Sequence, residues 1–298
     1  MIVDVHTHFL DFDTDIGPDL RADMRNCGIE PTSWKFTQEE YLEATKEADR
    51  VILFGLRAAK TGWNAPNQPV AEFAARHPHK YIYFVSIDPN EPDFMEQMEH
   101  AVKYQNAKGV KVGPVYQGLH PLDEKCDPIY AYCERHELPL MTHMATTFTS
   151  RVPLEYARPI HMDAVACRYP GLRIILAHMG HPWMAETLAV VRRQANVFAD
   201  VSALYYRPWQ FYQGLQLAVE YGCTRKLLMG SDYPATTTGG TIKAIRAVNE
   251  QLEGTGMPRI PTEVMEGIIH ADALKMLGIG DSAPARALAQ PIREGERA

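Results

Sequence analysis

The chain has 298 residues, of which 46% are hydrophobic and 22% are charged, and its formal net charge at pH 7 is −7. This composition predicts a globular protein with enough apolar material for a large core. The acidic balance argues against nucleic acid or an anionic membrane surface as a partner, since either needs a basic patch. We therefore expect the partner to be a small-molecule substrate.

The sequence predicts neither a membrane span nor a cleaved leader. No apolar run reaches the roughly 18 residues that a spanning helix needs, and no N-terminal segment combines basic, apolar and small-residue regions. The five cysteines are scattered and form no CxxC pair, a pattern that is typical of reduced thiols. We expect a cytoplasmic protein.

Short apolar or β-branched runs recur along the chain and predict β-strands. The runs are residues 2–9, 50–56, 81–88, 108–114, 138–144, 172–180, 196–204 and 225–234. Segments with helical periodicity lie between them, and in one of these Thr37 and Glu40 have the spacing of a capping box. This alternation of strand and helix predicts a parallel sheet.

Eight near-continuous apolar strands, each followed by a helix, predict a closed (β/α)8 barrel, the TIM barrel, rather than an open doubly wound sheet. We assign residues 1–278 to one barrel domain and residues 279–298 to a flexible C-terminal tail. Residues 11–36 are long for a connection between strand and helix. They predict a functional loop over the mouth of the barrel.

The first predicted strand carries two histidines separated by one residue. Because side chains alternate along a strand, Asp4, His6 and His8 are expected on one face, opposite Val3 and Val5. Two imidazoles on one face are costly in an apolar interior unless something binds them. A metal ion is the simplest candidate.

Other residues of the same chemical kind end further predicted strands. The fourth strand carries Lys111, while His143 ends the fifth, His178 the sixth and Asp232 the eighth. In a (β/α)8 barrel the carboxyl ends of the strands meet at the mouth that holds the active site. One histidine at a strand end is commonly structural, but several on one rim favour a site for Zn²⁺ or a neighbouring divalent ion.

Further polar and aromatic residues follow the predicted strands and could reach the mouth. They are Arg57, Tyr116, Arg151, Trp183, Tyr205, Tyr206 and Arg207. A cationic pair among them could hold a substrate carboxylate by bidentate contact. The alternative is that each belongs to ordinary loop surface.

Five segments carry a family resemblance. VDVHTHF, GVKVGPVYQGLHP, LPLMTHMATTF, LRIILAHMGHPW and LLMGSDYP resemble successive motifs of the amidohydrolase superfamily. The order of the motifs most resembles the amidohydrolase-related branch, also called amidohydrolase 2. That branch includes aminocarboxymuconate-semialdehyde decarboxylase and aromatic-acid decarboxylases alongside hydrolases and lactonases.

The resemblance implies a metal-dependent enzyme with one divalent ion, Zn²⁺ or alternatively Mn²⁺. It implies that His6, His8, His143 and Asp232 bind the ion, and that Asp232 also moves a proton. His178 is then a catalytic side chain. In binuclear relatives a carboxylated lysine at the position of Lys111 bridges two metals, but the mononuclear branch resembles this chain better. We therefore expect Lys111 to pair with Asp232 or to bind a substrate carboxylate.

The activity that we expect is hydrolysis of a small carboxylate or carbonyl compound at an amide, lactone or C–C bond, through a metal-activated water. Non-oxidative decarboxylation of a small unsaturated or aromatic acid is the alternative, because it uses the same residues. A third alternative is a non-catalytic metal-binding barrel. The assembly is expected to be a homodimer or a higher homo-oligomer.

Overall fold

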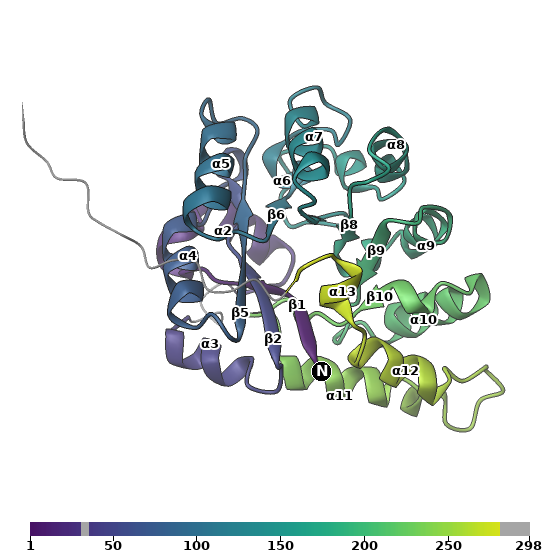
Figure 1. Cartoon of the computed structure of the whole chain (residues 1–298). Helices are drawn as coiled ribbons and strands as arrows, with labels where there is room; N and C mark the ends of the chain where they lie inside the picture. The colour runs from purple at the N-terminus through teal and green to yellow at the C-terminus, as the bar shows by residue number, and fades with distance from the viewer. Residues whose placement is uncertain (31–35, 281–298) are drawn as a thin grey trace, which may run out of the picture.

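The computed structural model describes residues 1–30 and 36–280 (Figure 1). Eight parallel strands form one sheet in the order β1-β2-β5-β6-β7-β8-β9-β10. The strands are β1 (Val3–His8), β2 (Arg50–Phe54), β5 (Tyr81–Ser86), β6 (Gly109–Val112), β7 (Leu140–Thr142), β8 (Ile174–Leu176), β9 (Val197–Asp200) and β10 (Leu227–Leu228). Each lies within one of the eight predicted runs.

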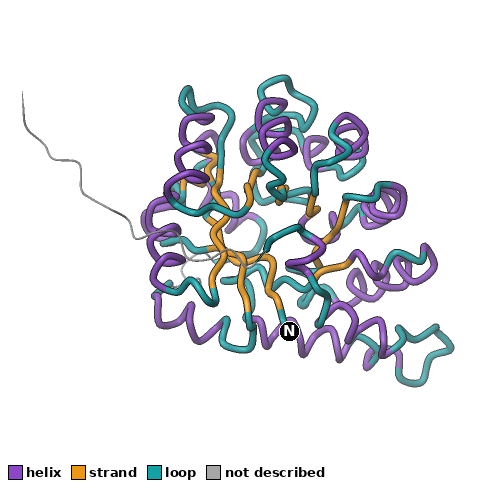
Figure 2. The backbone as a smooth tube through the Cα atoms, in the orientation of Figure 1, coloured by secondary structure: helices purple, strands orange, loops and turns teal. Residues whose placement is uncertain are grey.

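The first strand and the segment after the last one complete the ring. The Val5 amide donates to the Met229 carbonyl at 3.0 Å, and the Asp232 amide donates to the His6 carbonyl at 2.7 Å. Helices surround the ring of strands over most of the described chain (Figure 2). The predicted TIM barrel is therefore confirmed.

Helices lie between and after the strands, and most of them cover the outside of the barrel. They are α3 (Gln38–Ala44), α4 (Asn67–Arg76), α5 (Phe94–Tyr104), α6 (Pro114–Gln117), α7 (Asp127–Arg135), α8 (His161–Arg168), α9 (Met184–Arg193), α10 (Pro208–Tyr221), α11 (Thr238–Ala247), α12 (Thr262–Ile269) and α13 (Ala273–Met276). The predicted cap of α3 is confirmed, because the Thr37 side chain accepts from the Glu40 amide.

The predicted loop over residues 11–36 contains two helices that the sequence analysis did not predict. They are α1 (Phe12–Asp15) and α2 (Pro18–Asn26), while residues 31–35 lie outside the described part. Helix α2 begins with a proline in its first turn and buries Leu20 and Met24, one helical turn apart. These side chains pack against Trp63 of the short hairpin β3 (Arg57–Ala58) and β4 (Trp63–Asn64).

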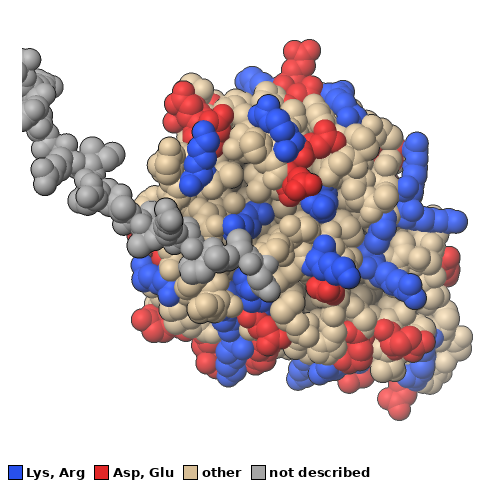
Figure 3. All heavy atoms as spheres, viewed as in Figure 1, with Lys and Arg blue, Asp and Glu red and all other residues tan. Residues whose placement is uncertain are grey.

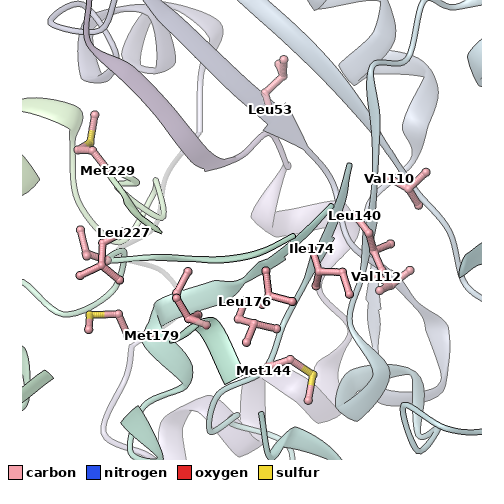
Figure 4. Close-up of a cluster of buried hydrophobic side chains, with 14 of the residues drawn as sticks. Leu53, Val110, Val112, Leu140, Met144, Ile174, Leu176, Met179, Leu227 and Met229 are labelled. Atoms are coloured by element: carbon pink, nitrogen blue, oxygen red, sulfur yellow. The ribbon is translucent and has the colours of Figure 1, made fainter. Parts of the chain in front are cut away.

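Strand residues divide between two apolar layers because successive side chains point to opposite faces. Ile174 and Leu176 belong to the layer between strands and helices, part of which Figure 4 shows. Ile175 belongs to the interior of the barrel, together with Phe54 and Phe84. The interior is thus a packed core, and only the strand ends are available for polar residues.

The last helix joins the interior layer. Leu274 and Leu277 of the α13 region cluster with inward-facing strand residues such as Val3 and Phe198, and α13 lies near the middle of the view in Figure 1. Ile279, which the sequence analysis placed in the tail, is only 8% exposed and belongs to the same cluster. Residues 281–298 of that tail lie outside the described part.

The first strand departs from the predicted alternation. Asp4 pairs with Val51 but Thr7 pairs with Leu53, so β1 holds one residue more than β2 over this stretch. This β-bulge shifts the alternation by one position. Val5 and His6 consequently both contribute to the interior, and the prediction that Asp4 shares a face with His6 is wrong.

The surface offers no single-sign patch on the face that Figure 3 shows. Lys and Arg side chains alternate there with Asp and Glu over the part that the grey atoms leave visible. Within residues 1–30 and 36–280, no helix has both the length and the apolar character that crossing a membrane requires. All five cysteines are free thiols.

Burial of α13 against the barrel interior predicts a measurable contribution to stability. Leu277→Ala removes a side chain with 0% exposure and should lower the free energy of unfolding by about 2–5 kcal/mol. Urea denaturation measures the change. The exposed Lys275 provides the matched control, since Lys275→Ala should stay within about 0.5 kcal/mol of the wild type. Equal small effects of both changes would contradict the packing role.

Candidate metal centre

Three electron-pair donors form a triangle at the mouth of the barrel. His6 Nε2 lies 3.4 Å from His8 Nε2, and Asp232 Oδ1 lies 3.4 Å from each of these nitrogens. The two histidines end β1, and Asp232 follows β10. Closure of the barrel therefore assembles the triangle, because the Asp232 amide is bonded to the His6 carbonyl.

The size of the triangle fits a divalent ion. Nitrogen and oxygen ligands lie about 2.0–2.2 Å from zinc, so neighbouring ligands of a tetrahedral site are about 3.3–3.6 Å apart. Three distances of 3.4 Å match this spacing. In addition, His6, His178 and Asp232 each offer an atom within 4.8 Å of the others.

Two further imidazoles complete the cluster. His178 Nε2 lies 3.2 Å from His143 Nδ1, and the His6 and His178 ring centroids are 4.7 Å apart. The other nitrogen of His143 lies 3.2 Å from the Thr146 carbonyl oxygen, which can only accept. His143 is thus protonated at Nε2, and its Nδ1 presents a lone pair to the cluster.

The five predicted residues therefore meet, although the arrangement does not reproduce the division of roles that the resemblance implies. His178, expected to be catalytic, has a ring nitrogen within 4.8 Å of donor atoms of His6 and Asp232, and these three residues could hold a metal ion together. His143, expected to be a ligand, contacts the triangle through His178. The geometry leaves both histidines near the metal position.

Burial keeps the imidazoles neutral. It lowers the pKa of His6 and His178 well below the ordinary value, with nearby positive groups adding to the effect, and it lowers the pKa of His143 to about 3. Neutral imidazole is the form that binds metal. Burial also raises the pKa of Asp232, which Lys111 opposes, and a bound cation would further favour the carboxylate.

Lys111 belongs to the cluster as well. Its side chain has 0% exposure, its Nζ lies 3.4 Å from His6 Nε2, and it sits 4.4 Å from the centre of the Phe54 ring. Burial lowers the pKa of Lys111 to about 8, although the carboxylates of Asp200 and Asp232 act in the opposite direction. The amine is thus much easier to deprotonate than an exposed lysine.

Two residues of the cluster have an unusual backbone conformation. His178 has a φ of 59° and Asp232 a φ of 62°, both in the left-handed region that disfavours side chains. Such conformations cost of order 1–3 kcal/mol and persist where the surrounding structure imposes them. The hydrogen bond from the Asp232 amide to His6 is one of those constraints.

Three residues of the site were not predicted from the sequence. Asp200 ends β9 and contacts His6, and Ser202, two residues later, contacts His178. The sequence does contain a signal for these two residues, because they are polar and lie near the end of the seventh predicted strand. Trp63, whose ring centroid lies 5.3 Å from that of His8, comes from a short hairpin that no sequence pattern indicated.

The predicted substrate-binding aromatic residues are at the site or beside it. Tyr116 is buried in α6 with its ring centroid 4.9 Å from that of His143. Trp183 precedes α9 and packs against the apolar cluster that contains Tyr116. The Tyr205 hydroxyl donates to the Ala235 carbonyl, which lies three residues after Asp232.

The two predicted arginines are engaged elsewhere. The Arg57 Nε atom donates to Glu91 at 3.0 Å, and Arg57 lines a surface depression of about 440 Å³ beside α4 and α5. Arg151 donates to Asp19 at 2.6 Å and so links its loop to α2. The structure does not bring either guanidinium to the histidine cluster.

Comparisons with known proteins identify a matching family model and several structures with the same fold. The family model described as Amidohydrolase matches residues 3–279, and no curated protein matches the chain. An uncharacterized TIM-barrel protein of Bordetella bronchiseptica is 20% identical, with a TM-score of 0.71 over 93% of this chain and 99% of that one.

Two further solved structures have the same fold. A probable 2-pyrone-4,6-dicarboxylic acid hydrolase of Acinetobacter baumannii, with citric acid bound, is 17% identical, with a TM-score of 0.64 over 93% of this chain and 99% of that one. The 5-carboxyvanillate decarboxylase of Novosphingobium aromaticivorans, complexed with manganese and 4-hydroxy-3-methoxy-5-nitrobenzoic acid, is 13% identical, with a TM-score of 0.63 over 94% and 96%.

The triangle predicts that the purified protein binds about one divalent ion per chain. His8→Ala removes one corner and should reduce the metal content well below that of the wild type. Elemental analysis after dialysis measures both. His79, exposed in the turn before β5, offers the control, since His79→Ala should keep its metal. An unchanged metal content in His8→Ala would exclude the triangle as the binding site.

Proposed function

The chain belongs to the amidohydrolase family, and we propose that it is a zinc-dependent hydrolase of small carboxylate or carbonyl compounds. The bond cleaved is that of an amide or lactone, or a C–C bond. The observation that carries the proposal is the 3.4 Å triangle of His6, His8 and Asp232. It fits a divalent cation, whose coordination a water or a substrate oxygen would complete.

We assign His6, His8, His143 and Asp232 as the residues that hold the ion. Zinc at such a site supplies Lewis acidity and lowers the pKa of water toward about 7. Asp232 is the most accessible corner, with 19% of its side chain exposed against 0% for His6. It can therefore accept a proton at its carboxylate from a water at the mouth and pass it to a leaving group.

His178 is the second acid–base residue. Its Nε2 lies 3.2 Å from His143 Nδ1 and belongs to the donor cluster with His6 and Asp232. An imidazole at this position can orient a water or a substrate carbonyl and hold a proton between two steps. Tyr116 and Trp63, whose ring centroids are 5.4 Å apart, limit water around the cluster from one side.

Among the three arginines that follow the strands, Arg207 is the one best placed to bind a substrate carboxylate. Its guanidinium lies 4.0 Å from the centre of the Tyr206 ring and donates to the Ala203 carbonyl at 2.7 Å. Both partners are uncharged, unlike those of Arg57 and Arg151. Its charge opposes the rise in the pKa of Asp232, which supports a position facing the site.

Decarboxylation is a second candidate because a decarboxylase that binds manganese and a nitrobenzoic acid shares the fold. Both reactions need a metal and one proton-transfer residue. They differ in product, since hydrolysis adds water and creates a new acid group, whereas decarboxylation releases CO₂.

The two activities can be separated in one assay series. The zinc-loaded protein should release acid from lactones and amides that carry a carboxylate, and a chelator should abolish this turnover. Hydroxybenzoic acids supply the competing substrates, with CO₂ release as their readout. Turnover of the acids without any hydrolysis would overturn the proposal in favour of decarboxylation.

His178→Asn tests the division between ligand and catalytic residue. Loss of an acid–base group lowers the rate by about 10²–10⁴-fold, and a residue that does not bind the metal should leave the metal content near that of the wild type. Loss of metal together with activity would make His178 a ligand. The arrangement with two metals and a carboxylated Lys111 would then be the better account.

A further inference from the structure

We infer that Asp200, acting partly through Ser202, sets the tautomers of His6 and His178, so that both rings present an unprotonated Nε2 to the metal centre. The inference rests on the proposed metal centre and adds two positioning residues to it. Both side chains have 0% exposure, so water does not compete for their hydrogen bonds.

Asp200 collects four donors on its two oxygens. Its Oδ1 accepts from the backbone amides of His178 and Ser202, each at 3.0 Å, and from the Ser202 hydroxyl. Its Oδ2 lies 2.9 Å from His6 Nδ1. A carboxylate so surrounded acts as an acceptor, and His6 therefore carries its proton on Nδ1.

Ser202 extends this effect to the second ring. Its hydroxyl has one proton, which is directed to Asp200 Oδ1. The same oxygen lies 2.7 Å from His178 Nδ1 and must accept there. His178 consequently carries its proton on Nδ1, and its Nε2 lone pair faces His143.

The arrangement makes Asp200→Asn a selective change. The amide oxygen must face the three donors that Oδ1 now accepts, so the amide nitrogen faces His6 Nδ1. That nitrogen can only donate. His6 then has to accept at Nδ1 and carry its proton on Nε2, where the proton points into the triangle and blocks metal binding.

The tautomers can be read directly. ¹⁵N chemical shifts of the imidazoles in metal-free protein distinguish a protonated Nδ1 from a protonated Nε2, and His6→Gln and His178→Asn assign the signals by their loss. The wild type should show both rings protonated at Nδ1. This spectrum needs neither a bound metal nor a substrate, and the wild-type result does not depend on the stability of Asp200→Asn or Ser202→Ala.

The variants then separate the two rings. Asp200→Asn should move the His6 proton to Nε2 and weaken zinc binding about 10–100-fold, the usual effect of losing a partner of a metal-binding histidine. Ser202→Ala should remove the hydrogen bond that fixes the His178 tautomer, so that His178 can carry its proton on either nitrogen. The His6 tautomer should not change. Asp88 is another buried aspartate, bonded to Asn90 and to no imidazole among the described residues, so Asp88→Asn should match the wild type.

The outcomes distinguish this inference from the proposed function. A wild type with either ring protonated at Nε2 overturns the inference, as does an Asp200→Asn variant that binds zinc normally with unchanged tautomers. In the latter case the metal centre stands. If the wild type shows the expected tautomers but binds no divalent ion, the proposed function fails and the assignment to Asp200 holds.

Discussion

The structure depends on one electrostatic constraint, which is that several lone pairs face each other inside a buried cluster. His6 Nε2, His8 Nε2 and Asp232 Oδ1 are 3.4 Å apart, and burial disfavours the protonated imidazoles that could relieve their repulsion. His8 Nδ1 is also buried, and it has no hydrogen-bond partner among residues 1–30 and 36–280. A cation at the centre turns these unfavourable contacts into ligand bonds.

Several local features of the fold serve that constraint. The bulge in β1 brings His6 into the barrel interior directly after Val5, and left-handed backbone at His178 and Asp232 turns two strand ends toward the same point. Each feature costs stability when considered alone. The apolar interior of the barrel, to which α13 contributes, is tightly packed. This packing can hold His178 and Asp232 in their strained conformations.

The barrel and the cluster could be predicted from the sequence because both follow from patterns that can be recognised in each strand separately. Apolar runs of strand length mark the strands, and the carboxyl ends of parallel strands converge whatever their sequence. His6, His143 and Asp232 thus meet as expected. What the sequence could not indicate depends on pairing between distant segments.

The register of β1 against β2, which creates the bulge, is one such feature. The pairing of Arg57 with Glu91 and of Arg151 with Asp19 is another, since these partners are 34 and 132 residues apart in sequence. The sequence does place Asp200 at a strand end, but it does not show which residue Asp200 contacts. Its importance lies in its contact with His6, 194 residues away.

Anomalous diffraction at the zinc absorption edge, from crystals grown with zinc, tests the central claim most directly. The account predicts one peak at the His6, His8 and Asp232 triangle, about 2.0–2.2 Å from each donor atom. The same map shows which of His143 and His178 completes the site. Absence of a peak at the triangle, with zinc bound elsewhere on the chain, would contradict the account.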